Sequence, residues 1–185
     1  MNLLVAAIFL VTCTPAYVRP ENLMARAFLN DEQAQFYTTL TLHERVEFST
    51  VIMMFRNAMA SGVDLQPRDL VNFARNKYPD LYEKLDKQQK KVDEMESALP
   101  PVVQQFIKDR RSEVRTWFPN GGVDTKAVAR TARLIGSEIA AMTVPERQAL
   151  FNYYPHMKEL LENPHFKAFM LEPDDLNEEL RAVIE

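Results

Sequence analysis

Apolar residues recur at helical spacing along most of the chain, and residues 46–60, VEFSTVIMMFRNAMA, show the pattern most strongly. At about 100° per residue, one set of these side chains falls on a single line of a helix. That line consists of Phe48, Ile52, Phe55 and Met59. Val46 and Met53 lie on the opposite side, where a surface helix is normally polar. The pattern therefore predicts a helix that buries a broad face and also contacts a second layer.

Helix start and stop signals divide the rest of the chain at short intervals. They predict helices over about 31–40, 42–61, 67–78, 79–99, 102–117 and 125–142, and another from about 144. Prolines at 155, 164 and 173 then cut the C-terminal third into short helices that end near Ile184. Because the chain has only 4 Gly and no long β-branched run, a sheet is not expected. The predicted fold is an all-α single domain of about nine or ten helices.

Two of the predicted helices begin in the same way. Thr41 and Glu44 are three residues apart, as are Thr143 and Glu146, which is the spacing of a capping box. The longer segments TLHERVEF and TVPERQAL also share an Arg and a following apolar residue. Two interpretations stay open: a duplicated helical unit, or two helix starts made alike by the chemistry of capping.

The charged segment 79–99 has a narrower apolar seam than the other predicted helices. The seam consists of Leu81, Leu85, Val92, Met95 and Leu99. We expect the remaining side chains of this segment to be solvated, because a single apolar stripe is sufficient for a surface helix.

The first residues differ in kind from the rest of the chain. Leu3 to Val11 is apolar without interruption but too short to span a bilayer as a helix, and small residues follow at Thr14 and Ala16. This pattern is typical of a secretory signal, so we expect residues 1–16 to be removed and residues 17–185 to form the helical domain, secreted from the cell. An uncleaved anchor and a buried first helix are the alternatives. Cleavage would remove Cys13, the single cysteine, so no disulfide is expected in the secreted chain.

Charge is distributed unevenly along the sequence. The whole chain carries −4, which argues against a nucleic-acid-binding protein. Residues 104–133 contain seven basic and three acidic residues, a net charge of +4. This excess predicts a basic face, which would hold a carboxylate head group or approach an anionic membrane surface transiently. A solvated face that balances acidic segments elsewhere is the other interpretation.

Nothing in the sequence indicates catalysis. No nucleophile-elbow, phosphate-loop or zinc-protease motif occurs. His43 lies in a predicted helix start, while His156 and His165 each adjoin a proline. His156 and Glu159 would share one helix face, but two ligands do not make a zinc site. We therefore expect a protein that is not an enzyme and has no metal or cofactor.

Three stretches of the sequence resemble the nematode fatty-acid- and retinol-binding proteins, which are secreted, cysteine-poor and helix-rich. They are FYTTLTLHERVEF from Phe36, LPPVVQQFIKDRRSEVRTWF from Leu99, and MTVPERQALFNYYPHMKELLENPHFKAF from Met142. The resembling features are helix caps, apolar positions and an aromatic-Pro turn, in the order and spacing of the family. The linking FPNGGVD and the high aromatic and Met content are particular to this chain.

The resemblance implies a wedge-shaped helical carrier with an internal apolar cavity for fatty acids, and retinol as a further ligand. The apolar faces supply the residues expected to line it: Phe48, Ile52, Phe55, Met59, Phe106, Ile107, Val114, Ile135, Ile139 and Phe151. A basic residue at the mouth would meet the carboxylate, and the candidates are Arg111, Arg115, Arg130 and Arg133. Gly136 lies within one of these apolar stripes, where close backbone approach or a ligand groove would explain it, and simple tolerance of a glycine is the alternative.

The same apolar faces also fit a solid core, because apolar stripes at helical spacing usually pack against one another. On that reading the protein is a secreted helical interaction module without a lipid site, whose basic face docks a partner. Composition does not separate the two hypotheses.

The signal-peptide hypothesis predicts a specific product. When the chain is expressed with its own N-terminus in a secretory host, the protein recovered from the medium should begin at Tyr17. Intact-mass spectrometry measures this directly. A secreted product that retains Met1 would show that the segment is not cleaved.

Overall fold

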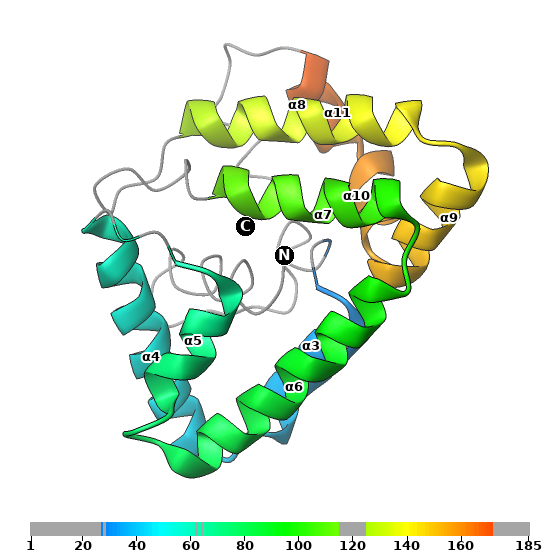
Figure 1. Cartoon of the computed structure of the whole chain (residues 1–185). Coiled ribbons are helices and arrows are strands. Elements are labelled where there is room, and N and C mark those ends of the chain that lie inside the picture. The colour runs from blue at the N-terminus through cyan, green and yellow to red at the C-terminus, as the bar shows by residue number, and fades with distance from the viewer. Residues whose placement is uncertain (1–26, 28, 62, 64, 115–124, 172–185) are drawn as a thin grey trace.

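The computed structural model describes residues 27, 29–61, 63, 65–114 and 125–171. These residues form nine helices and no strand, which confirms the all-α prediction for the described part of the chain. The helices surround the interior of the molecule like the sides of a triangle (Figure 1). The predicted helix ends at Gly62 and Trp117, the turn at 118–124 and the segment after Pro173 lie outside the described residues.

The first four described helices pack together along two sides of this triangle (Figure 1). They are α3 (Asp31–Thr39), α4 (Leu42–Ala60), α5 (Pro67–Ala74) and α6 (Pro79–Ser97). α5 packs against both α4 and α6, and α6 also contacts α3 and α4. Salt bridges from Lys91 to Glu32 (2.6 Å) and from Lys84 to Glu44 (2.6 Å) fasten α6 to its neighbours.

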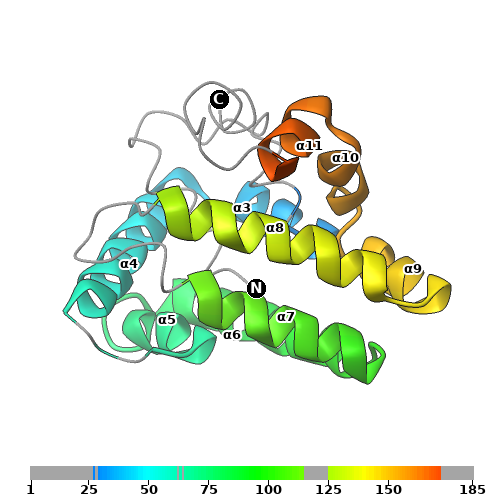
Figure 2. The same cartoon turned by 90° about the horizontal axis from the view of Figure 1, so that it is seen from above.

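The remaining helices form the third side and the corner next to it (Figures 1 and 2). They are α7 (Pro101–Val114), α8 (Thr125–Ala141), α9 (Val144–Tyr153), α10 (Met157–Glu162) and α11 (Pro164–Leu171). α7 packs against α8 and α9, while α11 packs against α8 and α10.

Capping chemistry explains most of the helix starts. Thr41 and Glu44 form the predicted capping box: the Thr41 N–H donates to the Glu44 carboxylate at 2.8 Å, and the Glu44 N–H donates to the Thr41 hydroxyl at 3.2 Å. Thr143 and Glu146 form the second. Proline occupies the first turn of α5, α6 and α9, where its missing N–H costs no hydrogen bond.

The predicted helix over 67–78 ends earlier than expected, at Ala74. The N–H groups of Lys77 and Tyr78 both donate to the Ala74 carbonyl, which closes a turn instead of continuing the helix. Tyr78 precedes Pro79, and a residue before proline is driven out of the α region by steric contact with the ring. The turn therefore reorients the chain before α6 begins.

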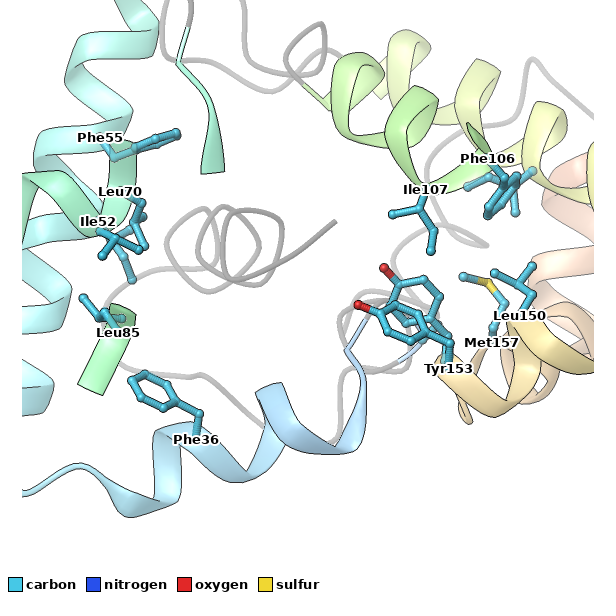
Figure 3. Close-up of a cluster of buried hydrophobic side chains, with 14 of the residues drawn as sticks. Phe36, Ile52, Phe55, Leu70, Leu85, Phe106, Ile107, Leu150, Tyr153 and Met157 are labelled. Atoms are coloured by element: carbon cyan, nitrogen blue, oxygen red, sulfur yellow. The ribbon is translucent and has the colours of Figure 1, made fainter. Parts of the chain in front are cut away.

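Buried side chains from the two groups of helices point into the interior of the molecule. Those of α3, α4, α5 and α6 gather on one side, and those of α7, α9 and α10 on the other (Figure 3). On α4 the predicted face is buried, with Phe48, Ile52 and Phe55 each exposed by 4% or less. The predicted second layer over α4 is wrong, because Val46 is 61% exposed and Met53 is 51% exposed.

The polar side of α6 is not wholly solvated, contrary to the prediction. Gln88 and Gln89 are buried, and α3, α4 and α5 all pack against α6. Gln89 donates to Asp93 at 2.7 Å within the helix, and Lys91 reaches across to Glu32. The sequence pattern marks the apolar seam but not the additional surface that the neighbouring helices bury.

One carboxylate joins the two groups of helices. Glu96, in the last turn of α6, pairs with the guanidinium of Arg111 on α7 and accepts a hydrogen bond from the hydroxyl of Tyr153 on α9 at 2.8 Å. Gln104 of α7 also donates to the Leu99 carbonyl at 2.7 Å, across the break made by Pro100 and Pro101. Burial, with the negative charge of Glu96 adding to it, raises the pKa of the Tyr153 hydroxyl, so Tyr153 remains a donor at physiological pH.

A second carboxylate, Glu44, combines capping with an ion pair. Hydrogen bonds from the Lys84 ammonium and the Thr41 backbone lower the pKa of Glu44 from 4.5 to about 2. The carboxylate therefore stays charged in the folded chain under conditions that would protonate it in the unfolded chain.

Glu44→Gln tests the contribution of this charge, since Gln also closes a capping box. A lowered pKa stabilises the fold fully above the unfolded value near 4.5 and loses that effect as pH falls through about 2. The wild-type thermal midpoint should exceed that of the variant at neutral pH, and the gap should shrink over that window. Circular dichroism melts measure it. Glu146→Gln, at a capping box without a lysine, is the control and should show a smaller gap; a gap independent of pH would contradict the assignment.

Tyr153→Phe tests the junction at Glu96, because it removes the hydroxyl and keeps the ring. Losing a hydrogen bond to a charged group should lower the free energy of unfolding by about 1.5–3 kcal/mol. The matched control is Tyr82→Phe, which removes a solvent-exposed bond to Arg75 and should cost less than about 0.5 kcal/mol. Urea denaturation measures both variants, and equal losses would show that the junction carries no special weight.

Candidate functional site

α8, α9 and α10 lie at one corner of the molecule (Figures 1 and 2). Side chains of these three helices line a groove there. Its volume is about 590 Å³, within the range of small-molecule sites in proteins. It is lined by Arg133, Gly136, Ser137, Ile139, Ala140, Arg147, Phe151, Lys158, Leu161 and Glu162. We call it the α8–α10 groove.

Local sequence explains why a hollow forms at this corner. The Thr143 capping box starts α9 directly after α8 ends, and Pro155 lies between α9 and α10, so the chain turns twice within a short stretch and places two short helices beside the end of α8. Gly136 faces the groove from the middle of α8 and has no side chain to fill it. A glycine inside a helix costs about 1 kcal/mol relative to alanine. Its position on the lining agrees with a ligand groove, one of the explanations offered for this glycine from the sequence.

The floor of the groove is apolar. Ile139 is buried, and Phe151 and Leu161 are half-buried side chains that pack against the hydrophobic core. Such a surface would gain about 0.8 kcal/mol for each methylene of a ligand that it removes from water.

The rim of the groove is cationic. Arg133, Arg147 and Lys158 each come from a different helix, and Glu162 is the one acidic residue among the lining side chains. Lys158 lies 3.7 Å from Glu162, at the long end of ion-pair distances. Within the described part of the chain, no carboxylate lies within ion-pair distance of Arg133 or Arg147. The Nε atom of Arg133 is buried and has no hydrogen-bond acceptor among the described residues, as is also the case for Nε of Arg110.

The described apolar residues expected to line one cavity belong to one hydrophobic core cluster but come from both groups of helices. Phe48, Ile52 and Phe55 are buried beside α5 and α6, whereas Phe106, Ile107 and Ile135 are buried in the second group of helices. Only Ile139 and Phe151 from the expected set line the α8–α10 groove. The side chains of Met59 and Val114 lie outside the described residues.

Of the arginines expected at the cavity mouth, only one is described on the lining of the groove. Arg133 lines the groove, Arg130 is exposed on α8, and Arg115 lies outside the described residues. Arg111 is already paired with Glu96.

The predicted basic face is in part an interior ion-pair network, which corrects the sequence interpretation. Arg110 is 3% exposed and pairs with Glu113 at 3.0 Å and with Glu138 at 3.2 Å. Its guanidinium also lies 5.4 Å from the centre of the Phe106 ring. Glu138 comes from the next helix, so the spacing of charges along one helix gave no indication of this pairing.

Sequence reasoning missed Arg147 and Lys158. Arg147 precedes Phe151 by four residues and Lys158 precedes Leu161 by three, which are spacings that put each cation beside an apolar residue on one helix face. That signal was present, but it pointed to the groove only if α9 and α10 were known to meet α8.

A second groove, of about 440 Å³, lies on the other side of α8. Val102, Gln105, Phe106, Asp109, Glu138, Ala141, Met142 and Glu146 line it. Each of its carboxylates already accepts a hydrogen bond or ion pair: Asp109 from Gln105, Glu138 from Arg110, and Glu146 from Thr143. This groove therefore offers less unsatisfied charge to a ligand than the α8–α10 groove.

Among the described side chains, no three His, Cys, Asp or Glu residues are placed to hold a metal ion. None of the described helices combines the length and apolar content required to cross a membrane. No protein-family model matches the sequence, and no curated protein or solved structure is significantly similar to it. The resemblance to the fatty-acid- and retinol-binding family therefore remains a prediction.

Proposed function

We propose that this protein is a secreted, non-catalytic carrier of single-chain lipids, whose ligands include fatty acids and retinol. The observation that carries the proposal is the α8–α10 groove, which combines an apolar floor with two arginines that lack an acidic partner in the described part of the chain. Ile139, Phe151 and Arg133, three residues expected on other grounds to contact the ligand, all line it. Transient contact with an anionic membrane surface belongs to the same proposal, because a carrier must load and unload.

The chemistry of the groove suits a fatty acid at both ends of the molecule. Burial of the acyl chain against Phe151, Ile139 and Leu161 would supply the free energy, at about 0.8 kcal/mol per methylene. A carboxylate in the groove would pair with the guanidinium of Arg133, which lines it. Charge-assisted bonds of this kind are about twice as strong as neutral ones, and leaving such a donor unpaired is costly. No covalent step is required.

A second candidate function is a helical interaction module with a solid core. The observation that favours it is the burial of Phe48, Ile52 and Phe55 within the packed core, away from the lining of either groove. On the outer side of α4, Leu42, Val46 and Met53 are exposed and would supply an apolar contact surface. This module would bind a protein partner and no lipid.

Titration of the lipid-stripped chain from Tyr17 with a dansyl-labelled fatty acid separates the two functions. The carrier predicts a saturable, blue-shifted emission that oleate and retinol displace, because the dye enters an apolar environment. In Gly136→Leu the new side chain should fill the groove and weaken probe binding by about tenfold or more, with a thermal midpoint equal to or above wild type, since leucine is the better helix former.

Ala141→Leu is the matched control, because Ala141 lies on the same helix but lines the second groove. It should leave probe binding unchanged. Equal loss in both variants would argue against the α8–α10 groove, and a folded, lipid-stripped protein that gives no enhancement would favour the interaction module.

A further inference from the structure

We infer that, among single-chain amphiphiles, the α8–α10 groove prefers one with a phosphate monoester head group over the carboxylate with the same chain. The inference rests on the proposed function and names the ligand class more narrowly. It follows from three observations: the number of cations at the groove, the helices that carry them, and the lack of an acidic partner for Arg133 and Arg147 in the described part of the chain.

The charge of the groove exceeds what a carboxylate neutralises. Arg133, Arg147 and Lys158 contribute three positive charges and Glu162 contributes one negative charge, which leaves a net charge of +2. A carboxylate carries −1 and would leave one cation without a counter-charge. A phosphate monoester carries about −1.5 to −2 at neutral pH and matches the groove.

The placement of the cations fits a head group with several acceptor oxygens. The three side chains project from α8, α9 and α10, so they approach the groove from three elements rather than along one helix face. A phosphate monoester offers three strong acceptors in a tetrahedral arrangement, whereas a carboxylate offers two in one plane. Arginine recognises phosphate through paired N–H donors, while lysine acts as a point charge. Two arginines and one lysine therefore provide donors for all three oxygens.

The two arginines that line the groove are available to pair with a ligand. In the described part of the chain, neither Arg133 nor Arg147 has an acidic partner within ion-pair distance. Arg110 and Arg111, on neighbouring α7, show the contrast, since both are neutralised by glutamates. The apolar floor formed by Ile139, Phe151 and Leu161 distinguishes an alkyl phosphate from free phosphate, which has no chain to bury.

Competition for the bound dansyl-labelled fatty acid tests the selectivity. The competitors are oleate, oleyl phosphate, oleyl alcohol and inorganic phosphate, so the first three share one chain and differ in charge. At a pH of about 7.5, oleyl phosphate should displace the probe at roughly tenfold lower concentration than oleate, because it gains one further charge-assisted contact. Inorganic phosphate should not displace it at comparable concentrations.

Two variants and one control locate the preference. Arg147→Gln and Lys158→Gln should bring oleyl phosphate and oleate to within about twofold of each other while both still displace the probe. Arg130→Gln, an exposed position on α8 outside the groove, should keep the wild-type preference. Lowering the pH to about 5 should also reduce the preference, because the second phosphate pKa is near 6.

The outcomes distinguish the failure of the phosphate preference from the failure of the carrier function. Equal displacement by oleate and oleyl phosphate in the wild-type protein overturns the phosphate selectivity and leaves the carrier function standing. Displacement by inorganic phosphate as effective as that by oleyl phosphate overturns the amphiphile. If the probe does not bind, calorimetric titration with oleyl phosphate decides the matter: binding that Gly136→Leu removes supports the inference, and no binding overturns both the inference and the carrier function.

Discussion

The arrangement of the helices depends on one carboxylate. Glu96 ends α6, and its two strong partners, Arg111 and Tyr153, belong to α7 and α9. The paired prolines at 100 and 101 break the chain, but a break alone does not set an angle. Charge-assisted hydrogen bonds shielded from water are directional, so this contact fixes how the second group of helices is oriented against the first. Because α9 forms one wall of the α8–α10 groove, the shape of the groove depends on a contact outside it.

The basic residues of the chain serve two different purposes. Arg110 and Arg111 are drawn into the structure by glutamates, and their charge is neutralised there. Arg133 and Arg147 lie on α8 and α9, which pack against the helix of Arg110 and Arg111, but they have no such partner among the described residues. The difference lies in where the carboxylates are, not in the cations. Net charge over a segment therefore overstates the charge that a ligand meets, and the relevant quantity is the charge left after internal pairing.

Features that depend on neighbours along the chain could be predicted from the sequence, and features that depend on distant segments could not. The boxes at Thr41 and Thr143 and the proline starts were found because capping involves residues three or four apart. The second layer over α4 failed because a periodic pattern shows that Val46 and Met53 are apolar, not that another element covers them. The groove combined expected residues, such as Ile139 and Arg133, with Arg147 and Lys158, whose relevance depended on how three helices meet.

At Gly136, the volume of the groove and the stability of α8 make opposite demands on the side chain. The groove exists partly because this residue has no side chain, yet glycine is a poor residue for the middle of a helix. Alanine would strengthen α8 and narrow the space by one methyl group, and larger residues would narrow it further. Selection for stability alone would therefore favour a larger residue at this position and a smaller groove. Only selection for what the groove holds would retain the glycine. A comparison of natural variants at this position would thus record the size of the cargo that each one carries.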